Sequence, residues 1–124
     1  MRPFLWISLG AILGANLRYL IASVAAKASV FQFPYGTLLI NISGSFLLGA
    51  FMVWSTERAI VNPRYQLLFA IGFCGSYTTF SSYAFETFAL LERGQWGGFA
   101  LNIILSNLLC LAAVVGGAVL ARSV

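Results

Sequence analysis

Long stretches of this chain carry no charged residue, and this feature limits its possible folds more than any other. Of 124 residues, only seven are Lys or Arg and three are Glu. Charged residues make up 8% of the chain, whereas about 25% is usual in soluble proteins. With 60% hydrophobic residues and 11 Phe, the composition is also the opposite of a disordered chain. The sequence therefore predicts a protein of the lipid bilayer.

Four segments are long and apolar enough to cross a bilayer, for which about 20 residues are needed. They predict an all-α membrane protein, a single transmembrane domain over residues 1–124 with four transmembrane helices. The expected spans are Phe4–Ala26, Gly36–Thr56, Tyr65–Phe85 and Gly98–Ala121. Pro34 and Pro63 fall in the links between spans, where helices are expected to break. Four crossings would place both termini on one side of the membrane.

Lys and Arg are nearly balanced between the two expected faces of the membrane. The face with the termini would hold Arg2, Arg58, Arg64 and Arg122, and the other would hold Lys27, Arg93 and, near that end of its span, Arg18. Positive charge sets orientation during insertion. The weak bias predicts that the chain inserts both ways up and pairs antiparallel with a second copy. A fixed orientation with a weak signal is the alternative.

Polar residues repeat at helical spacing in two of the expected spans. The repeats are Thr37, Asn41 and Ser45 in one span, and Asn102, Ser106 and Cys110 in another. Residues four apart share a helix face, and polar groups inside a bilayer are usually functional. The stripes predict either hydrogen bonding between helices or the wall of a narrow polar path. Gly44 and Gly49, near the first stripe, would let another helix approach closely.

The third expected span contains a stretch that disfavours a continuous helix. Residues 72–83 include two Gly and five Ser or Thr. Gly is a poor helix former, and Ser and Thr compete for backbone hydrogen bonds. We therefore expect a helix that is broken in mid-membrane and whose freed carbonyl groups face a cavity or a cation. A continuous helix rich in small packing residues is the alternative.

Charged side chains occur at two places within or beside the expected spans. Arg18 could attract anions to a path, or it could simply extend to the membrane interface. Glu86 directly follows the third span. It could accept a hydrogen bond from Ser82, one turn earlier, or merely mark the interface.

Several classes of function are not expected from this composition. The chain has no His, and Cys74 and Cys110 fall in apolar runs, so neither a zinc site nor a disulfide framework is expected. An enzyme is not expected either, because no credible set of nucleophile, base and metal ligands is present. The net charge of +4 is not gathered into a patch, so no nucleic-acid partner is expected.

Three segments together resemble the CrcB/Fluc family of fluoride channels. They are GAILGANLRY (10–19), GTLLINISGSFLLG (36–49) and GFCGSYTTFSSY (72–83), and the resemblance covers nearly the whole chain. It implies an antiparallel, dual-topology homodimer with two fluoride pores. Such a protein would be a multi-pass protein of the plasma membrane, in bacteria the inner membrane. It would export fluoride passively and so lower fluoride toxicity in the cytoplasm.

The resemblance also implies roles for individual residues of the fluoride route. Asn41 would donate a hydrogen bond to the ion, and Phe80 would turn its ring edge toward it. Tyr83 stands where the family usually has a second such Phe. Its added hydroxyl would either donate to the anion or block the path. The other route residues would be the hydroxyl-bearing Thr37, Ser81, Ser82 and Ser106, with the charged Arg18 and Glu86 toward the two ends.

A structural cofactor follows from the same resemblance. Carbonyl groups of Gly75 and Thr78 from both subunits would hold a sodium ion at the centre of the dimer interface. A buried cation would add a positive field near the anion route.

Two other functions suit a small chain with four spans. A dual-topology antiporter of cations or drugs would need an acidic residue in the first span to exchange protons, but that span has Arg18 and no acid. A scaffold subunit that transports nothing would need neither a broken span nor stripes of hydrogen-bond donors. Fluoride conduction is therefore the predicted function.

Overall fold

The computed structural model describes residues 2–28, 32–57 and 61–124, and all of its regular structure in these ranges is helical. Arg58, which entered the count of charges, lies outside the described residues. In chain order the helices are α1 (Arg2–Ala28), α2 (Tyr35–Glu57), α3 (Pro63–Tyr65), the π-helix η1 (Gln66–Cys74), α4 (Gly75–Tyr77), α5 (Phe80–Glu92) and α6 (Trp96–Ser123).

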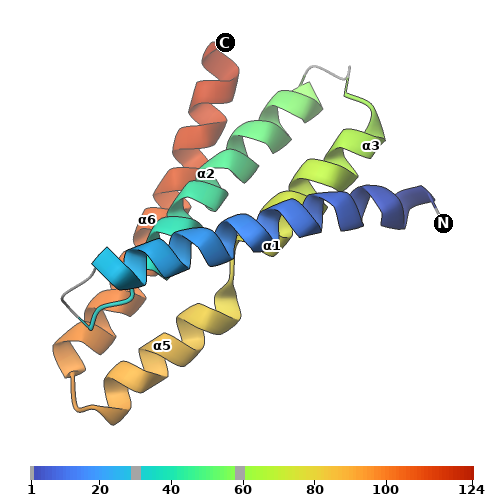
Figure 1. The fold of residues 1–124 in the computed structure, drawn as a ribbon. Coiled ribbons are helices and arrows are strands. Elements are labelled where there is room, and N and C mark those ends of the chain that lie inside the picture. The colour runs from blue at the N-terminus through green and yellow to red at the C-terminus, as the bar shows by residue number, and fades with distance from the viewer. Residues whose placement is uncertain (1, 29–31, 58–60) are drawn as a thin grey trace.

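The chain runs back and forth along the molecule (Figure 1). Helices α1, α2 and α6 each form one leg of this path. The series α3, η1, α4 and α5, which follows α2 and precedes α6 in the chain, forms the third leg. The turn between α5 and α6 and the start of α2 lie at the end of the molecule opposite both termini (Figure 1).

Helices α1, α2 and α6 are each long and apolar enough to cross a membrane, with 27, 23 and 28 residues. They contain three of the segments expected to span and extend each by no more than two residues at either end. Many of their large apolar side chains face outward, with Leu13 and Val115 each 61% exposed. Apolar surface of this extent is typical of a protein that faces lipid. The chain is a multi-pass membrane protein.

Glycines let α1 lie directly against the third leg. A Cβ atom on Gly10 would lie 2.7 Å from the backbone nitrogen of Phe73, and one on Gly14 would lie 3.0 Å from that of Tyr77. Both glycines are buried. Any larger residue would push the two backbones apart.

A second glycine contact joins α2 to α6. A Cβ atom on Gly49 would lie 3.0 Å from Cα of Val114, and one on Gly117 would lie 2.8 Å from the nitrogen of Ala50. The close helix approach predicted at Gly49 is confirmed. Gly44 instead faces the third leg, where its Cβ would lie 3.0 Å from Cδ1 of Tyr77.

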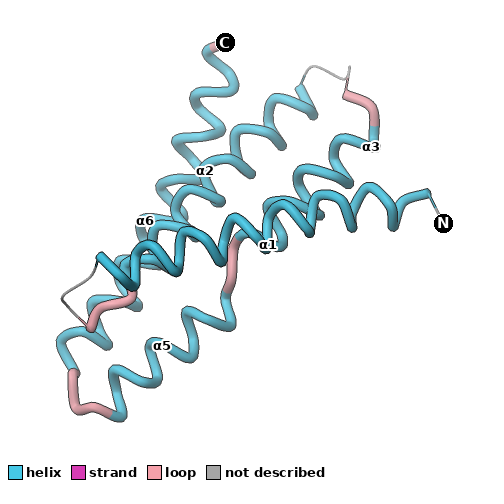
Figure 2. The backbone as a smooth tube through the Cα atoms, in the orientation of Figure 1, coloured by secondary structure: helices cyan, strands magenta, loops and turns pink. Residues whose placement is uncertain are grey.

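The third leg consists of helical pieces with an extended segment between them. Thr78 has φ −75° and ψ 157°, and Thr79 has φ −151° and ψ 116°. Helix α4 therefore ends at Tyr77, and α5 begins at Phe80 after a short loop (Figure 2). Because of this loop, the third leg holds no single helix of spanning length. The π-helical turns of η1 were not predicted.

Helix α5 continues well beyond Phe85, where the third span was expected to end. It stops only at Glu92, where Gly94 adopts a φ of +70°. There the amides of Gly94 and Gln95 bond back to the carbonyls of Leu91 and Leu90 at 3.0 and 2.9 Å. Glycine adopts this left-handed conformation without steric cost. Glu86 thus lies within a helix rather than at its end.

Candidate functional site

The loop between α4 and α5 is held by the side-chain amide of Asn41 on α2. Asn41 Nδ2 donates to the Thr79 carbonyl at 3.0 Å, and the Thr79 amide donates to Asn41 Oδ1 at 2.8 Å. Asn41 thus pairs with Thr79 as a neighbouring strand would. Both backbone groups of an extended residue inside the helix bundle are satisfied in this way.

Thr79 in turn caps the start of α5. Its hydroxyl accepts from the Ser82 amide and donates to Ser82 Oγ, both at 3.1 Å. Ser81 Oγ lies 3.2 Å from the same hydroxyl. A threonine in this position stabilises the first turn of a helix. Ser81 and Ser82 therefore gather around Thr79 at the beginning of α5.

The hydrogen bonds of the Thr79 and Ser82 amides to side chains take the usual donors away from two backbone carbonyl groups. In a continuous α-helix the Thr79 amide would donate to Gly75, and the Ser82 amide would donate to Thr78. Here they donate to the side chains of Asn41 and Thr79. The carbonyl oxygens of Gly75 and Thr78 thereby lose these helical donors, and oxygen ligands of this kind suit hard cations.

A cavity of about 330 Å³ lies beside this loop, between α2, the start of α5 and α6; we call it the polar cavity. It brings together Asn41, Phe80, Tyr83 and Ser106, which were predicted separately as site residues. The two polar stripes also meet here through Ser45 and Cys110. The full lining is Asn41, Ser45, Leu48, Thr78, Thr79, Phe80, Tyr83, Ser106, Asn107, Cys110, Leu111 and Val114.

The aromatic rings of Phe80 and Tyr83 lie side by side at the polar cavity. Their centroids are 5.4 Å apart with an interplanar angle of 58°. Phe80, the first residue of α5, is 79% exposed. Aromatic ring edges carry partial positive charge, so rings in this position can attract an anion.

The N-terminal residue of the α6 stripe, Asn102, joins two helices. Asn102 is 1% exposed, and its Nδ2 donates to Thr87 Oγ1 on α5 at 2.8 Å. Thr87 donates to the Tyr83 carbonyl, and Ser106 donates to Asn102 Oδ1 at 3.3 Å. The hydrogen bond of Asn102 to α5 confirms bonding between helices, while Ser106 and Cys110 line the polar cavity.

Thr37 and Glu86 meet at a separate cavity of about 270 Å³. Thr37 Oγ1 donates to Glu86 Oε1 at 2.8 Å. The hydrogen bond to Glu86 thus comes from α2, and the expectation that Ser82 would supply it is wrong. Within the described part of the chain, the second carboxylate oxygen is buried without a partner. The lining is Ala22, Ala25, Ala26, Gln32, Phe33, Pro34, Tyr35, Gly36, Thr37 and Glu86.

Arg18 is half-buried on α1 and lines neither of these two cavities. The structure therefore does not bring it together with the other predicted site residues.

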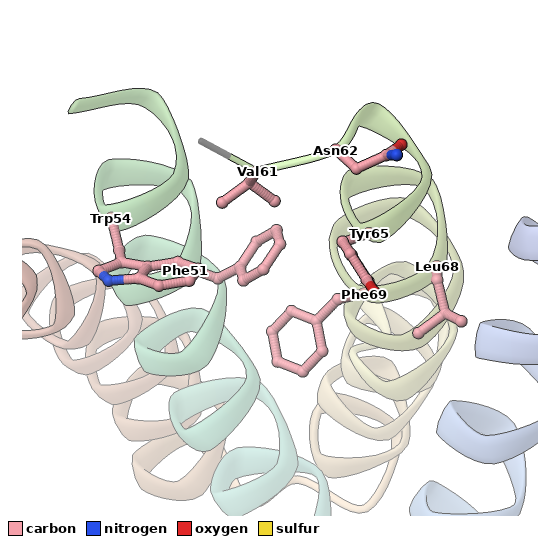
Figure 3. A pocket seen from close by; sticks show the side chains of 7 residues that line it. All are labelled: Phe51, Trp54, Val61, Asn62, Tyr65, Leu68 and Phe69. Atoms are coloured by element: carbon pink, nitrogen blue, oxygen red, sulfur yellow. The ribbon is translucent and has the colours of Figure 1, made fainter. Parts of the chain in front are cut away.

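A larger cavity contains none of the predicted site residues. It has a volume of about 560 Å³ and lies between the end of α2 and the start of the third leg (Figure 3). Phe51 and Phe69 face each other there, with ring centroids 4.7 Å apart. The Asn62 side-chain oxygen accepts from the Arg64 amide at its edge. An apolar cavity of this kind offers little to an ion, so the polar cavity is the better candidate.

Three polar residues of the site were missed from the sequence: Thr79, Thr87 and Asn107. Asn107 lines the polar cavity, and Thr87 accepts from Asn102. A signal for Asn107 existed, because an amide inside an otherwise apolar run is costly in a bilayer. It was overlooked because it lies outside the stripe with a spacing of four.

The fold and the polar cavity define an all-helical, multi-pass membrane protein with neutral hydrogen-bond donors beside an interrupted helix. This chain belongs to the family described as "CrcB-like protein, Camphor Resistance (CrcB)", whose profile matches residues 5–118.

Two curated relatives match this chain over nearly its whole length and theirs. A protein of Koribacter versatilis (strain Ellin345) is 55% identical over 124 residues, covering 100% of this chain and 98% of the relative. A protein of Sulfurihydrogenibium sp. (strain YO3AOP1) is 42% identical over 122 residues, covering 98% of each chain. Both relatives are named fluoride-specific ion channel FluC.

Proposed function

We propose that this protein is a fluoride-selective ion channel that exports fluoride passively and lowers its toxicity in the cytoplasm. The observation that carries the proposal is the polar cavity, where an amide, hydroxyls and two aromatic rings meet. The curated relatives named as fluoride channels support it. A channel of this kind is not an enzyme.

The chemistry of the polar cavity suits fluoride better than a larger anion. Fluoride is small and strongly hydrated, so a path must replace its water with donors placed close together. Neutral donors such as Asn41 Nδ2 and the ring edges of Phe80 and Tyr83 can do this without trapping the ion. A fixed positive charge would bind it too firmly, and conduction requires release. The lining of the polar cavity includes no charged residue.

The other predicted residues would form the remaining parts of the route. Thr37 and Glu86 share a second cavity on the same helices, α2 and α5. Ser81 and Ser82 lie beside Thr79 at the N-terminus of α5. Arg18 would raise the local anion concentration from a vestibule without contacting the ion along its path.

We propose an antiparallel homodimer, with the third leg broken in mid-membrane. The near balance of Lys and Arg between the two faces supports insertion in both orientations. Exposed rings on α5 support a partner there, since Phe80, Phe85 and Phe88 are 79%, 72% and 51% exposed. In bacteria the dimer would lie in the inner membrane.

We further propose that a sodium ion binds at the centre of the dimer as a structural cofactor. The carbonyl oxygens of Gly75 and Thr78 would hold it, and they fit because their helical donors are diverted. When bound, the ion would supply positive charge that favours an anion nearby. Replacing sodium by a bulky organic cation during dialysis is expected to weaken the dimer or lower fluoride flux. A dimer and a flux that both survive this exchange would exclude the ion.

Fluoride efflux from liposomes that contain the purified protein tests the proposed function. A fluoride electrode should record rapid efflux, and a chloride electrode should record none above that of protein-free liposomes. Absence of fluoride efflux, or equal efflux of chloride, would refute a fluoride-selective channel.

A further inference from the structure

The hydroxyl of Tyr83 has an unusual hydrogen-bonding position in the wall of the polar cavity. Asn107 Nδ2 lies 3.4 Å from it and also donates to the Ile103 carbonyl at 2.8 Å. An amide nitrogen carries two hydrogens and accepts none. With both hydrogens engaged, Asn107 leaves the Tyr83 hydroxyl as the acceptor. The proton of that hydroxyl must therefore point elsewhere.

Two other hydroxyls at the polar cavity donate to protein acceptors. Thr78 Oγ1 donates to the Cys74 carbonyl at 2.9 Å, and Ser106 Oγ donates to Asn102 Oδ1 at 3.3 Å. Among the residues that the structure describes, no acceptor is found for the Tyr83 hydroxyl proton. Tyr83 therefore has a donor to offer to whatever enters the polar cavity.

We propose that Asn107 orients the Tyr83 hydroxyl so that it donates a hydrogen bond to fluoride in the polar cavity. This inference rests on the proposed function and deepens it by assigning a binding role to the hydroxyl and a positioning role to Asn107. Hydrogen bonds to an ionised acceptor are about twice as strong as neutral ones. The neighbouring ring of Phe80, 5.4 Å away, would share the same ion through its edge.

The hydroxyl does not fill the polar cavity in this arrangement. The polar cavity keeps a volume of about 330 Å³ with Tyr83 in its wall, which is ample for a monatomic anion. The interpretation of Tyr83 as a donor therefore fits the geometry better than its interpretation as a block.

The test is the fluoride concentration that gives half-maximal flux through the protein in liposomes. Tyr83→Phe removes only the hydroxyl, and it is expected to raise this concentration roughly tenfold. Asn107→Leu is expected to raise the half-saturating fluoride concentration as well, but by a smaller factor. The double variant should resemble Tyr83→Phe alone, because Asn107 acts through the hydroxyl.

Matched controls exist for both substitutions. Asn16 on α1 has an exposed amide that bonds to the Ile12 carbonyl at 2.7 Å, as Asn107 bonds to Ile103. Tyr65 lies at the apolar cavity. Asn16→Leu and Tyr65→Phe are both expected to leave the half-saturating concentration unchanged.

The outcomes separate this inference from the proposed function. If the unaltered protein passes no fluoride, the proposed function fails, and the role of Tyr83 fails with it. If the unaltered protein conducts and Tyr83→Phe saturates at the same concentration, the inference alone is refuted. If the effects of Tyr83→Phe and Asn107→Leu add fully, Asn107 does not act through Tyr83, which would overturn its positioning role.

Discussion

Single side chains hold this protein together where its helical hydrogen bonds are interrupted. Asn41 pairs with both backbone groups of Thr79, and Thr79 caps Ser82. Away from the loop, Asn102 joins α6 to Thr87 on α5. In a medium of low dielectric constant, polar groups without partners are especially costly. Substitutions at these few residues should therefore have larger effects than those elsewhere in the spans.

Asn41→Leu is expected to destabilise the protein by about 2–6 kcal/mol. It would leave the amide and the carbonyl of Thr79 without partners, and each such group costs about 1–3 kcal/mol. Denaturant unfolding in detergent, followed by circular dichroism, measures this loss. Asn16→Leu is the control, since its amide contacts only a carbonyl within its own helix. A loss for Asn41→Leu no larger than for Asn16→Leu would contradict the importance of the pairing.

Phe80→Ile is expected to lower fluoride flux at least tenfold while the dimer stays intact. Isoleucine keeps apolar bulk but lacks the positive ring edge that would attract an anion. Liposome efflux measures the flux, and size-exclusion chromatography measures the dimer. Phe4→Ile changes an exposed ring on α1 that lines neither the polar cavity nor the cavity with Glu86, so its flux should be normal. Normal flux in Phe80→Ile would remove Phe80 from the route.

Glycine positions determine how closely the helices of this protein approach one another. Gly10 and Gly14 bring α1 against the third leg, and Gly49 and Gly117 bring α2 against α6. The sequence could predict the long helices because each is a long, predominantly apolar run. It could not predict where α5 ends. A single Glu86 bonded to Thr37 does not stop a helix, whereas the backbone of Gly94 does.

The candidate site was partly predictable for a similar reason. Asn41 and Ser106 stood out because polar groups at helical spacing are rare in apolar spans. That they share one cavity depends on how α2, α5 and α6 pack, which spacing along one helix cannot reveal. The pairing of Asn41 with Thr79 also joins residues from separate elements. For this reason the sequence predicted that Asn41 would bond to another helix or donate to the ion, and its pairing with the backbone of Thr79 was not foreseen.

Gly44→Ala is expected to disturb the loop between α4 and α5. The added Cβ would lie 3.0 Å from Cδ1 of Tyr77 and would also press on Thr78. Overpacking of this kind costs about 1–3 kcal/mol, and fluoride flux should fall with it. Unfolding and efflux measurements test both effects. Gly97→Ala on α6 is the control because nothing lies within 4 Å of its Cβ. Equal stability and flux in the two variants would show that the loop tolerates displacement.

At the scale of the whole molecule, the surface of a single copy indicates how it would assemble. Helix α5 exposes three Phe rings to its surroundings. The only salt bridge among the described residues joins Arg122 to Glu57, and Lys and Arg are nearly balanced between the two expected faces. A second copy inserted the other way up could cover α5 without a strong orientation signal. The balance of Lys and Arg thus becomes a property that can be tested by changing it.

Removing Lys27 and Arg93 together is expected to force one orientation and abolish fluoride flux. The face with the termini would then dominate in positive charge, and the insertion machinery would place it in the cytoplasm. Ala59→Cys, labelled by an impermeant maleimide, reports the orientation against a background with only Cys74 and Cys110. The parent should label from both faces, and the charge variant from one. Flux should return when the charge variant is coexpressed with a chain biased the opposite way. One-sided labelling of the parent, or full flux in the one-sided variant, would contradict an antiparallel pair.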